Sequence, residues 1–310
     1  MTRISEIGER GLIEDFRTFL RTGADVGPGD DAAVIGGDLV VTSDMVSFDR
    51  HMPAGMTFEQ FGWYSAAVSF SDLAAMGARP IGFLASLGLP GDLDAQMAYD
   101  IMSGIDQCAE FCDTFVVGGD TKPGPGIVAG TALGRMEGRK PMLRSGAKAG
   151  DLLAVTGPLG APAAALLAMD HGLEAPDAMS CLCLPVPKVE EGIALASSGR
   201  VTACMDLSDS LGTALNTLCE ASHVSIEVYP DFVPLGPDVE RVAELTGTPT
   251  DDLVFGCGGE YELLFTVGRD GLDALYSTDV EFTVIGKVAE GGRPYKVRPG
   301  KTEEVGYGTY

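Results

Sequence analysis

The segment 69–78, S-F-S-D-L-A-A-M-G-A, places one carboxylate, Asp72, inside an otherwise apolar helical stretch. An ionised aspartate on a buried helix face is costly unless it is paired or bound to a cation. A chain that keeps this residue must fold so that other polar groups or cations meet it. The segment therefore predicts a charged site beside a buried helix.

Further acidic clusters follow the same logic. They are G-D-D at 29–31, T-S-D at 42–44, G-G-D-T at 118–121 and D-L-S-D at 206–209. Carboxylates without histidine or cysteine partners favour Mg²⁺ over zinc, and Mg²⁺ held in this way usually has phosphates as its other ligands. The pattern predicts ATP chemistry. No G-x-x-x-x-G-K-[ST] loop occurs in the sequence, which excludes an ordinary P-loop kinase.

Length and charge narrow the class of protein. With 310 residues, 45% of them hydrophobic, the chain can form one large or two ordinary domains. A net charge of −24 argues against nucleic-acid binding, because such a surface repels phosphate backbones. Residues 1–20 contain no uninterrupted apolar stretch, and the apolar run 161–169 is too short to span a bilayer. We expect a soluble, cytoplasmic protein with no membrane partner.

Hydrophobic periodicity indicates two α/β domains. Helices are expected over 4–20, 57–76, 94–111, from 161, over 189–197 and over 211–221. Strands are expected over 32–35, 39–42, 81–89, 115–117, 127–136, 152–156, 224–228, 262–267 and 282–288. The spacing Thr57-x-x-Gln60 predicts a capping box at the start of the helix that carries Asp72. A linker near 138–150 separates an N-terminal domain, 1–140, from a C-terminal α/β domain, 150–310.

Eight motifs occur in an order that resembles the thiamine-monophosphate kinase family. They are G-D-D-A-A-V near 29, T-S-D near 42, S-D-L-A-A-M-G-A near 71, G-G-D-T near 118, R-S-G-A-K-A-G-D near 144, T-G-P-L-G near 156, D-L-S-D-S-L near 206 and Y-E-L-L-F-T near 261. This family is part of a superfamily of ATP-binding proteins that includes aminoimidazole ribonucleotide synthetase, selenophosphate synthetase and a hydrogenase maturation protein. The motifs near 71 and 144 favour the thiamine-monophosphate branch.

The resemblance implies an α+β fold with two α/β-type domains. The N-terminal mixed sheet would bind ATP and metal and pair into a barrel across a homodimer, with a C-terminal α/β sandwich behind it. The implied reaction transfers phosphate from ATP to thiamine monophosphate, giving thiamine diphosphate and ADP. The acceptor oxygen is already ionised at neutral pH, so alignment and charge neutralisation matter more than a general base. No catalytic acid or base is therefore expected.

The resemblance also assigns residues. The implied ligands of several Mg²⁺ ions are Asp31, Thr42, Ser43, Asp44, Asp72, Asp120, Asp206 and Asp209. The implied ATP contacts are Gly119, Asp120, Arg144 and Ser208. For Asp206 and Asp209, capping of the helix at 211–221 stays an alternative. A solvated linker position is the alternative for Arg144, and a turn or helix-cap role is the alternative for Asp30.

His51, Glu260 and Tyr307 are the implied contacts of thiamine monophosphate. The sequence around His51 is S-F-D-R-H-M, where the family has V-x-G-x-H-F, and a lone surface histidine is the alternative. Tyr307 would stack on a substrate ring, unless the tail is frayed. The segment G-G-E-Y-E at 258–262 lacks one acidic residue of the family pattern G-G-E-D-Y-E. Glu260 can therefore replace the family's glutamate or its aspartate, but not both.

Two other functions stay open. One is a sibling synthetase that acts on another phosphorylated substrate. A hydrogenase maturation protein would need a C-terminal cysteine where this sequence has Tyr310, and a selenophosphate synthetase would need one before Cys108. The other is a non-catalytic nucleotide-binding relative, which only the shortened 258–262 motif favours. ATP turnover would separate that relative from an enzyme.

Overall fold

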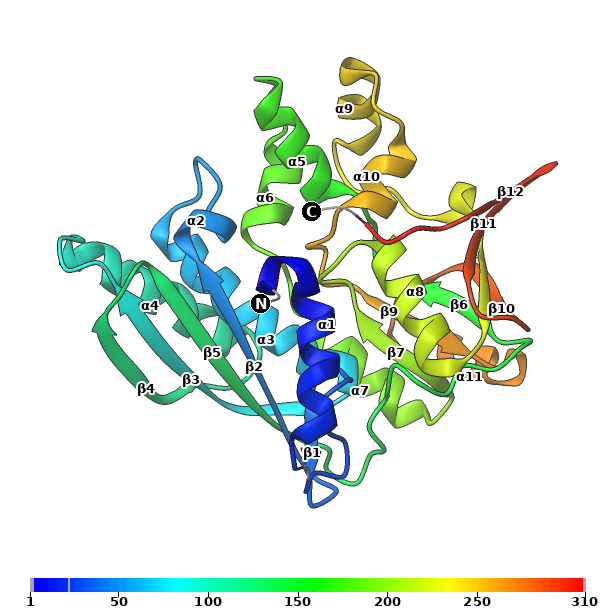
Figure 1. Ribbon diagram of the computed structural model, residues 1–310, viewed down its shortest axis with the longest axis horizontal. Helices are drawn as coiled ribbons and strands as arrows, with labels where there is room; N and C mark the ends of the chain where they lie inside the picture. The colour runs from blue at the N-terminus through cyan, green and yellow to red at the C-terminus, as the bar shows by residue number, and fades with distance from the viewer. Residues whose placement is uncertain (1–2, 22, 309–310) are drawn as a thin grey trace.

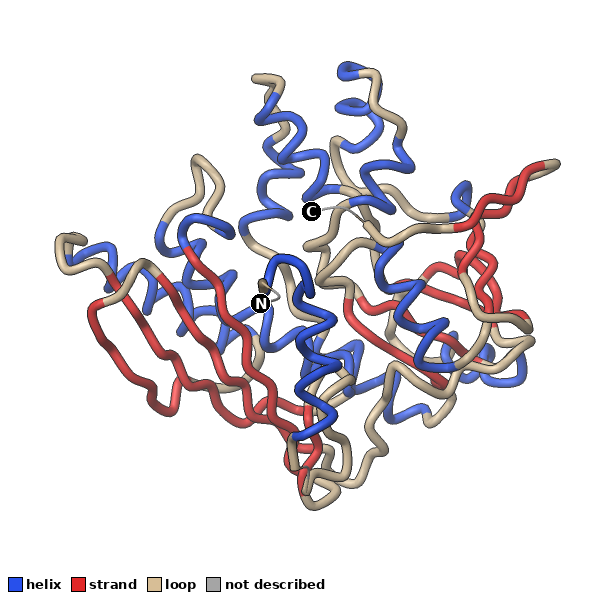
Figure 2. The backbone as a smooth tube through the Cα atoms, in the orientation of Figure 1, coloured by secondary structure: helices blue, strands red, loops and turns tan. Residues whose placement is uncertain are grey.

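The chain folds around two β-sheets, the first from its N-terminal half and the second from its C-terminal half (Figure 1). The computed structural model describes residues 3–21 and 23–308. The two groups of strands lie at opposite sides of the molecule, with helices between them (Figure 2). The connecting segment 136–151, all of it described, holds neither helix nor strand. The architecture is a two-domain mixed α/β fold, as the resemblance implied.

The N-terminal sheet is mixed. Its strand order is β1 (Ala33–Ile35), β2 (Leu39–Ser47), β5 (Ile127–Arg135), β3 (Arg79–Leu89) and β4 (Val116–Pro123). Strands β3 and β4 run parallel, and the other pairings are antiparallel. Helix α4 (Ala95–Phe111) makes the crossover between β3 and β4, because parallel strands cannot be joined by a tight hairpin. Two further helices, α1 (Ile4–Phe19) and α2 (Phe48–His51), flank the first two strands.

The two faces of this sheet differ. Helix α3 (Phe58–Met76) packs on one face, against β2, β5 and β3. Along β5 the buried residues Val128 and Ala132 alternate with half-buried ones, as expected when one face of a strand is covered. On the opposite face Ile35, Met45 and Val117 are 47%, 64% and 49% exposed. We call this opposite side the open face of the N-terminal sheet.

Helix α3 is the central helix of the fold. The predicted capping box is confirmed: Thr57 Oγ1 accepts from Gln60 N at 3.1 Å, and Gln60 Oε1 accepts from Thr57 N at 2.9 Å. The helix is apolar nearly all round, which is typical of a buried helix. It lies against α4 so closely that a Cβ added to Gly104 would lie 1.8 Å from the carbonyl oxygen of Glu59. This sequence therefore builds Asp72 into the middle of the protein.

The C-terminal sheet is also mixed. Its strand order is β12 (Lys301–Glu304), β11 (Pro294–Arg298), β8 (Ser225–Val228), β10 (Thr283–Ala289), β6 (Leu152–Val155), β9 (Leu263–Val267) and β7 (Val201–Asp206). Around it lie α5 (Ala161–Asp170), α6 (Pro176–Cys183), α7 (Val189–Ser198), α8 (Leu211–Ser222), α9 (Val239–Thr246), α10 (Thr250–Gly256) and α11 (Leu272–Tyr276). Helices α5, α6, α9 and α10 gather at one end of the molecule, at the top of Figure 1.

The two halves meet at α3. Both α7 and β7 of the C-terminal half pack on this helix. The approach of α7 is close, since a Cβ added to Gly192 would lie 2.1 Å from the carbonyl oxygen of Ala74. Strand β7 ends at Asp206, so this packing carries that carboxylate to the helix that holds Asp72. The domain interface therefore positions the acidic residues of both halves.

Most of the expected helices and strands are confirmed, and the differences have local causes. Strands β2 and β4 extend beyond the expected 39–42 and 115–117. Strand β7 was not expected, because V-T-A-C-M-D shows no alternation and its last four residues are buried. Helix α1 is kinked at Gly8, whose φ of 73° is left-handed. Among the described residues, the structure contains no helix that is both long and apolar enough to cross a bilayer.

Candidate metal and phosphate site

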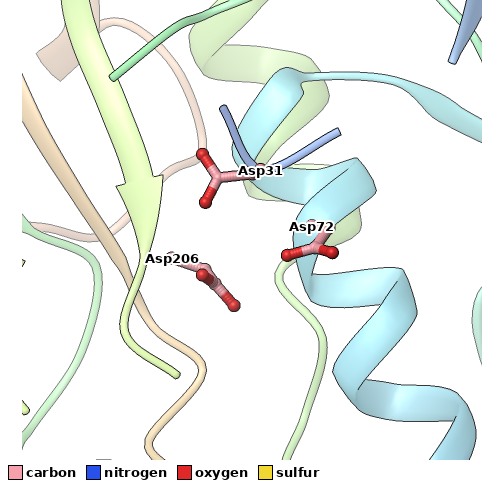
Figure 3. Close-up of side chains that lie close together, drawn as sticks. All are labelled: Asp31, Asp72 and Asp206. Atoms are coloured by element: carbon pink, nitrogen blue, oxygen red, sulfur yellow. The ribbon is translucent and has the colours of Figure 1, made fainter. Parts of the chain in front are cut away.

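Three carboxylates from distant parts of the chain converge at the domain interface. Asp31 precedes β1, Asp72 lies on α3 and Asp206 is the last residue of β7. One oxygen of each lies within 4.8 Å of the others. The three side chains project into a common space between the helix and the end of the strand (Figure 3). The structure thus brings together three of the residues predicted as metal ligands.

Strand β2 adds a fourth carboxylate. Alternation along the strand turns Thr42 and Asp44 toward α3. The Thr42 hydroxyl donates to Asp72 Oδ2 and so orients that carboxylate. Asp44 lies close enough to raise the pKa of Asp72. We call Asp31, Asp44, Asp72 and Asp206 the acidic centre.

Ser43 differs from its neighbours on β2. Its side chain projects to the open face, where Oγ donates to the Gly130 carbonyl oxygen at 2.8 Å. The period of two in a strand makes this unavoidable once Thr42 and Asp44 face α3. Ser43 was predicted to offer its hydroxyl or its carbonyl oxygen to a metal. The hydroxyl lies on the open face, so a contact through the carbonyl oxygen stays a prediction.

The acidic centre contains oxygen atoms without hydrogen bonds. Among the described residues, the buried atoms Asp31 Oδ2, Asp44 Oδ2 and Asp206 Oδ1 have no hydrogen-bond partner. Buried polar atoms are nearly always partnered, because leaving one unpaired costs about 1–3 kcal/mol, and more when it is charged. Three such oxygens in one place fit a set of hard-cation ligands that supplies only oxygen atoms.

The electrostatics of the acidic centre agree with this reading. Two carboxylates 4.8 Å apart repel by roughly 3–4 kcal/mol at an effective dielectric constant of 20. Burial, together with Asp44, Asp206 and Asp31, raises the pKa of Asp72 well above its ordinary value. Burial, with Asp31 nearby, raises the pKa of Asp206 to about 7. A divalent cation would relieve both effects.

Arg144 is the cation that faces this centre. Its Nη2 and Nε donate to Asp31 Oδ1 at 2.7 and 3.2 Å, and its backbone N donates to Asp30 Oδ1 at 2.6 Å. Burial disfavours the guanidinium charge, but the Asp31 carboxylate more than offsets this and raises the pKa of Arg144. The alternative of a solvated linker arginine is excluded. Asp30 holds the linker in place, in keeping with a structural role.

The D-L-S-D loop leads into helix α8. Ser210 is the N-cap of this helix, and its Oγ accepts from Thr213 N at 3.1 Å. The N-cap position is therefore held by Ser210 and not by Asp206 or Asp209. The structure leaves Asp209 half-buried and Ser208 exposed in the loop directly after Asp206. Both lie within three residues of Asp206 in the sequence.

Asp120 lies away from the acidic centre. The register across the sheet aligns Met45, Ala129, Ser86 and Asp120, so Asp120 shares the open face with Met45. Its strand, β4, is three strands from β2, or about 14 Å. Asp120 pairs instead with Lys122 at 2.8 Å. A single chain therefore does not bring Asp120 to the other predicted ligands.

Gly119, beside Asp120, has a structural reason to be glycine. A Cβ at this position would lie 1.7 Å from the carbonyl oxygen of Ala85 on the neighbouring strand β3. Any larger residue would separate β4 from β3. Strand packing alone thus explains the glycine at position 119 within one chain.

His51 and Glu260, which were predicted to bind the acceptor, each accept a hydrogen bond from a backbone N–H. His51 ends α2, and its Nδ1 accepts from Ser47 N at 3.1 Å. Burial lowers the pKa of His51, which favours the neutral ring. Glu260 Oε1 accepts from Gly160 N at 2.9 Å, and burial raises the pKa of Glu260 to about 8. His51 is therefore packed into the protein and is not a lone surface histidine.

Tyr307 is held on helix α8. Its hydroxyl donates to Glu220, and the next residue, Gly308, donates from its backbone N to Thr213 Oγ1 at 3.2 Å. The tail is therefore ordered through Gly308, which excludes the frayed alternative for Tyr307. The ring is 47% exposed and tied to Glu220, away from the acidic centre. Tyr310 lies outside the described residues.

Several polar residues of the site were not predicted. Ser71 Oγ donates to Asp206 Oδ2 at 2.6 Å, which joins α3 to β7. Its position next to Asp72 was the only signal in the sequence. Tyr64 and Tyr261 share a hydrogen bond of 2.8 Å between their hydroxyls. They are 197 residues apart, so no local pattern could indicate that pair.

The titration of Asp206 gives a testable consequence. Its pKa of about 7, against an ordinary value of 3.8, means that the folded protein keeps a proton which the unfolded chain releases in that window. Without metal, stability should therefore fall as the pH rises through the window. We expect the Tm in chelator to be about 5 °C lower at about pH 8 than at about pH 5. Added Mg²⁺ should restore most of the difference.

Asp206→Asn is the matched variant for this measurement. It keeps the shape of the side chain but cannot ionise, so the pH dependence of its Tm in chelator should be smaller than that of the wild type. Acidic groups far from the acidic centre affect both proteins equally, and loss of the Asp206 charge also lessens the shift of Asp72, which acts in the same direction. Identical pH dependence in the two proteins would show that Asp206 does not carry this effect.

The chain is similar to known proteins over nearly its whole length. Two family models match: AIR synthase related protein, N-terminal domain, over residues 29–136, and AIR synthase related protein, C-terminal domain, over residues 148–297. The thiamine-monophosphate kinase of Pyrococcus abyssi is 36% identical over 282 residues, which cover 89% of this chain and 87% of that protein. That of Halobacterium salinarum is 33% identical over 261 residues, covering 84% and 87%.

Solved structures agree with these matches. A structure described as AaThiL complexed with AMPPCP and TMP has a TM-score of 0.86 and 28% identity. The match covers 98% of this chain and 99% of that one. The hydrogenase maturation protein HypE has a TM-score of 0.75 at 18% identity, covering 94% and 92%, which shows a shared fold alone.

Proposed function

This chain belongs to the thiamine-monophosphate kinases of the AIR synthase related family, and we propose that its acidic centre carries out their phosphoryl transfer. The protein uses ATP to phosphorylate thiamine monophosphate, giving thiamine diphosphate and ADP. The resemblance inferred from the motifs is confirmed. The convergence of Asp31, Asp72 and Asp206 on one space is the observation that carries the proposal.

The acidic centre would hold Mg²⁺. Asp31, Asp44 and Asp206 supply buried oxygens, and Asp72 supplies a half-buried carboxylate. Asp209 in the adjacent loop can add another oxygen. Mg²⁺ bound there would neutralise the facing phosphates of donor and acceptor and hold them in line. Thr42 and Ser71 orient two of these carboxylates through hydrogen bonds to Asp72 and Asp206. The donor set is all oxygen, which suits Mg²⁺ and excludes a zinc-like site.

Arg144 would face the phosphates of ATP. A guanidinium has five N–H donors, and two of them are used on Asp31. The remaining donors can bind a phosphate without breaking that ion pair. The pairing also keeps the guanidinium fixed before ATP arrives, which lowers the entropic cost of binding. Gly119 and Ser208 remain predicted ATP contacts.

His51 and Glu260 would bind thiamine monophosphate. Both are anchored by backbone N–H groups, so their orientation is set before the acceptor binds. The chain needs no group to remove a proton from the acceptor, because its phosphate oxygen is ionised at neutral pH. Tyr307 could reach a substrate ring only after leaving Glu220, so its role stays a prediction.

The open face of the N-terminal sheet would pair with a second copy. Its exposed residues Ile35, Met45 and Val117, and the exposed edge strand β4, are features of an interaction surface. Pairing two such sheets into a barrel would cover these residues in a homodimer. Asp120 lies on this face, so we propose that the partner's Asp120 completes the metal site.

Product analysis tests the proposed function. Purified protein would be incubated with ATP, Mg²⁺ and thiamine monophosphate, with free thiamine as the parallel acceptor. We expect thiamine diphosphate and ADP from the monophosphate, in equal amounts, and no thiamine monophosphate from thiamine. No product, despite Mg²⁺-dependent binding of ATP, would overturn the proposal in favour of a sibling synthetase or a non-catalytic relative.

A further inference from the structure

Two tyrosines form a polar contact between the domains that none of the assigned roles explains. Tyr64 lies on α3, and Tyr261 lies in the segment before β9. Their hydroxyl oxygens are 2.8 Å apart, and their rings meet edge to face with centroids 5.9 Å apart. Tyr261 is 5% exposed. Tyr64 is half-buried, so the pair is a partly buried hydrogen bond with defined geometry.

The pair lies between the acidic centre and the residues proposed for the acceptor. Tyr64 precedes Asp72 by eight residues, or about 12 Å along the same helix. Its ring centroid is 6.3 Å from that of His51, and Tyr261 directly follows Glu260. Tyr261 N donates to the carbonyl oxygen of Leu207, the residue after Asp206. The pair therefore has neighbours in both parts of the proposed site.

The backbone fixes Tyr261 in this position at a cost. Its φ is 56°, a left-handed conformation that is uncommon for a bulky residue. Tyr261 N donates to the Leu207 carbonyl oxygen at 3.0 Å, and Leu207 N donates to that of Glu262 at 2.8 Å. These bonds join the shortened 258–262 motif to the loop that begins at Asp206. The strain is maintained at a point where the ring reaches Tyr64.

The chemistry of two phenols leaves one proton available. A hydroxyl–hydroxyl hydrogen bond uses one of the two O–H protons, and the second can be donated to a third oxygen. Among the residues that the structure describes, neither hydroxyl has another hydrogen-bond partner. Burial, with Tyr64 beside it, raises the pKa of Tyr261 well above its ordinary value, so the group stays protonated at neutral pH. A protonated donor among carboxylates suits an anionic oxygen.

We propose that the Tyr64–Tyr261 pair donates a hydrogen bond to the phosphate of thiamine monophosphate and positions it against the acidic centre. This inference rests on the proposed function and names residues that set acceptor binding. Arg144 lies on the Asp31 side of the centre, so the nucleotide should not depend on the tyrosines.

The test is calorimetric binding to protein loaded with Mg²⁺ and AMPPCP. We expect Tyr64→Phe and Tyr261→Phe each to raise the Kd of thiamine monophosphate about tenfold or more, as for loss of a hydrogen bond to a charged group. The Kd of AMPPCP should stay within about twofold, and the Tm should fall little, because the rings remain. Tyr99→Phe, at a 67% exposed site on α4, is the matched control and should bind both ligands as the wild type does.

The outcomes are distinct. Unchanged binding of thiamine monophosphate in both variants overturns the inference and leaves the kinase assignment intact. Equal weakening of AMPPCP and thiamine monophosphate also overturns it, because the pair would then only hold the domains together. Wild-type protein that fails to bind thiamine monophosphate would overturn the proposed function, and with it this inference.

Discussion

Asp72→Asn is expected to abolish turnover while the protein remains folded. The amide keeps the size of the side chain but replaces a negative oxygen at the meeting point of Asp31, Asp44 and Asp206. An amide is a weaker ligand for Mg²⁺, and loss of one preorganised charge contact typically costs roughly a hundredfold to a thousandfold in kcat. The measurement is steady-state formation of thiamine diphosphate at saturating Mg²⁺.

Stability separates this effect from misfolding. Removing one of four crowded carboxylates reduces their repulsion, so the Tm of the variant in chelator should equal or exceed that of the wild type. Asp106→Asn, at an exposed position on α4, is the matched control and should retain full activity. Wild-type activity in Asp72→Asn would show that the Asp72 carboxylate is not needed for phosphoryl transfer.

The second large effect concerns Asp120. We expect Asp120→Asn and Asp72→Asn homodimers each to be nearly inactive, and a heterodimer of the two variants to recover about half of wild-type activity. In that heterodimer one site would combine an intact Asp72 from one chain with the partner's Asp120, and the other site would have neither. The measurement uses co-expressed chains with two different tags, purified in tandem.

Two controls accompany this prediction. Light scattering should give twice the chain mass of 32.3 kDa for the wild type and for the heterodimer. A wild-type mass of one chain would contradict the proposed dimer. A heterodimer as inactive as its parents would place the action of Asp120 within its own chain or outside the reaction.

The sequence predicted the parts of this fold that depend on local pattern. Helix α3 begins at the capping box of Thr57 and ends at Gly77, which is left-handed, and both are features of the local sequence. The helix is also apolar enough to require burial. Strand β7 escaped prediction because it is buried without alternation. The linker was recognised by composition, but its role was not. The linker places Arg144 at the acidic centre, where its backbone N binds Asp30 and its guanidinium binds Asp31.

The sequence by itself determined which acidic residues lie in apolar segments, and these indicated metal and ATP chemistry. The order of the motifs around carboxylates such as Asp72 was enough to identify the family. Only the tertiary structure decided which of them meet. Strand alternation turned Asp44 inward and Ser43 outward, sheet register put Asp120 on the open face, and domain packing joined Tyr64 to Tyr261. These relations depend on register and on contacts between segments far apart, which residue spacing does not encode.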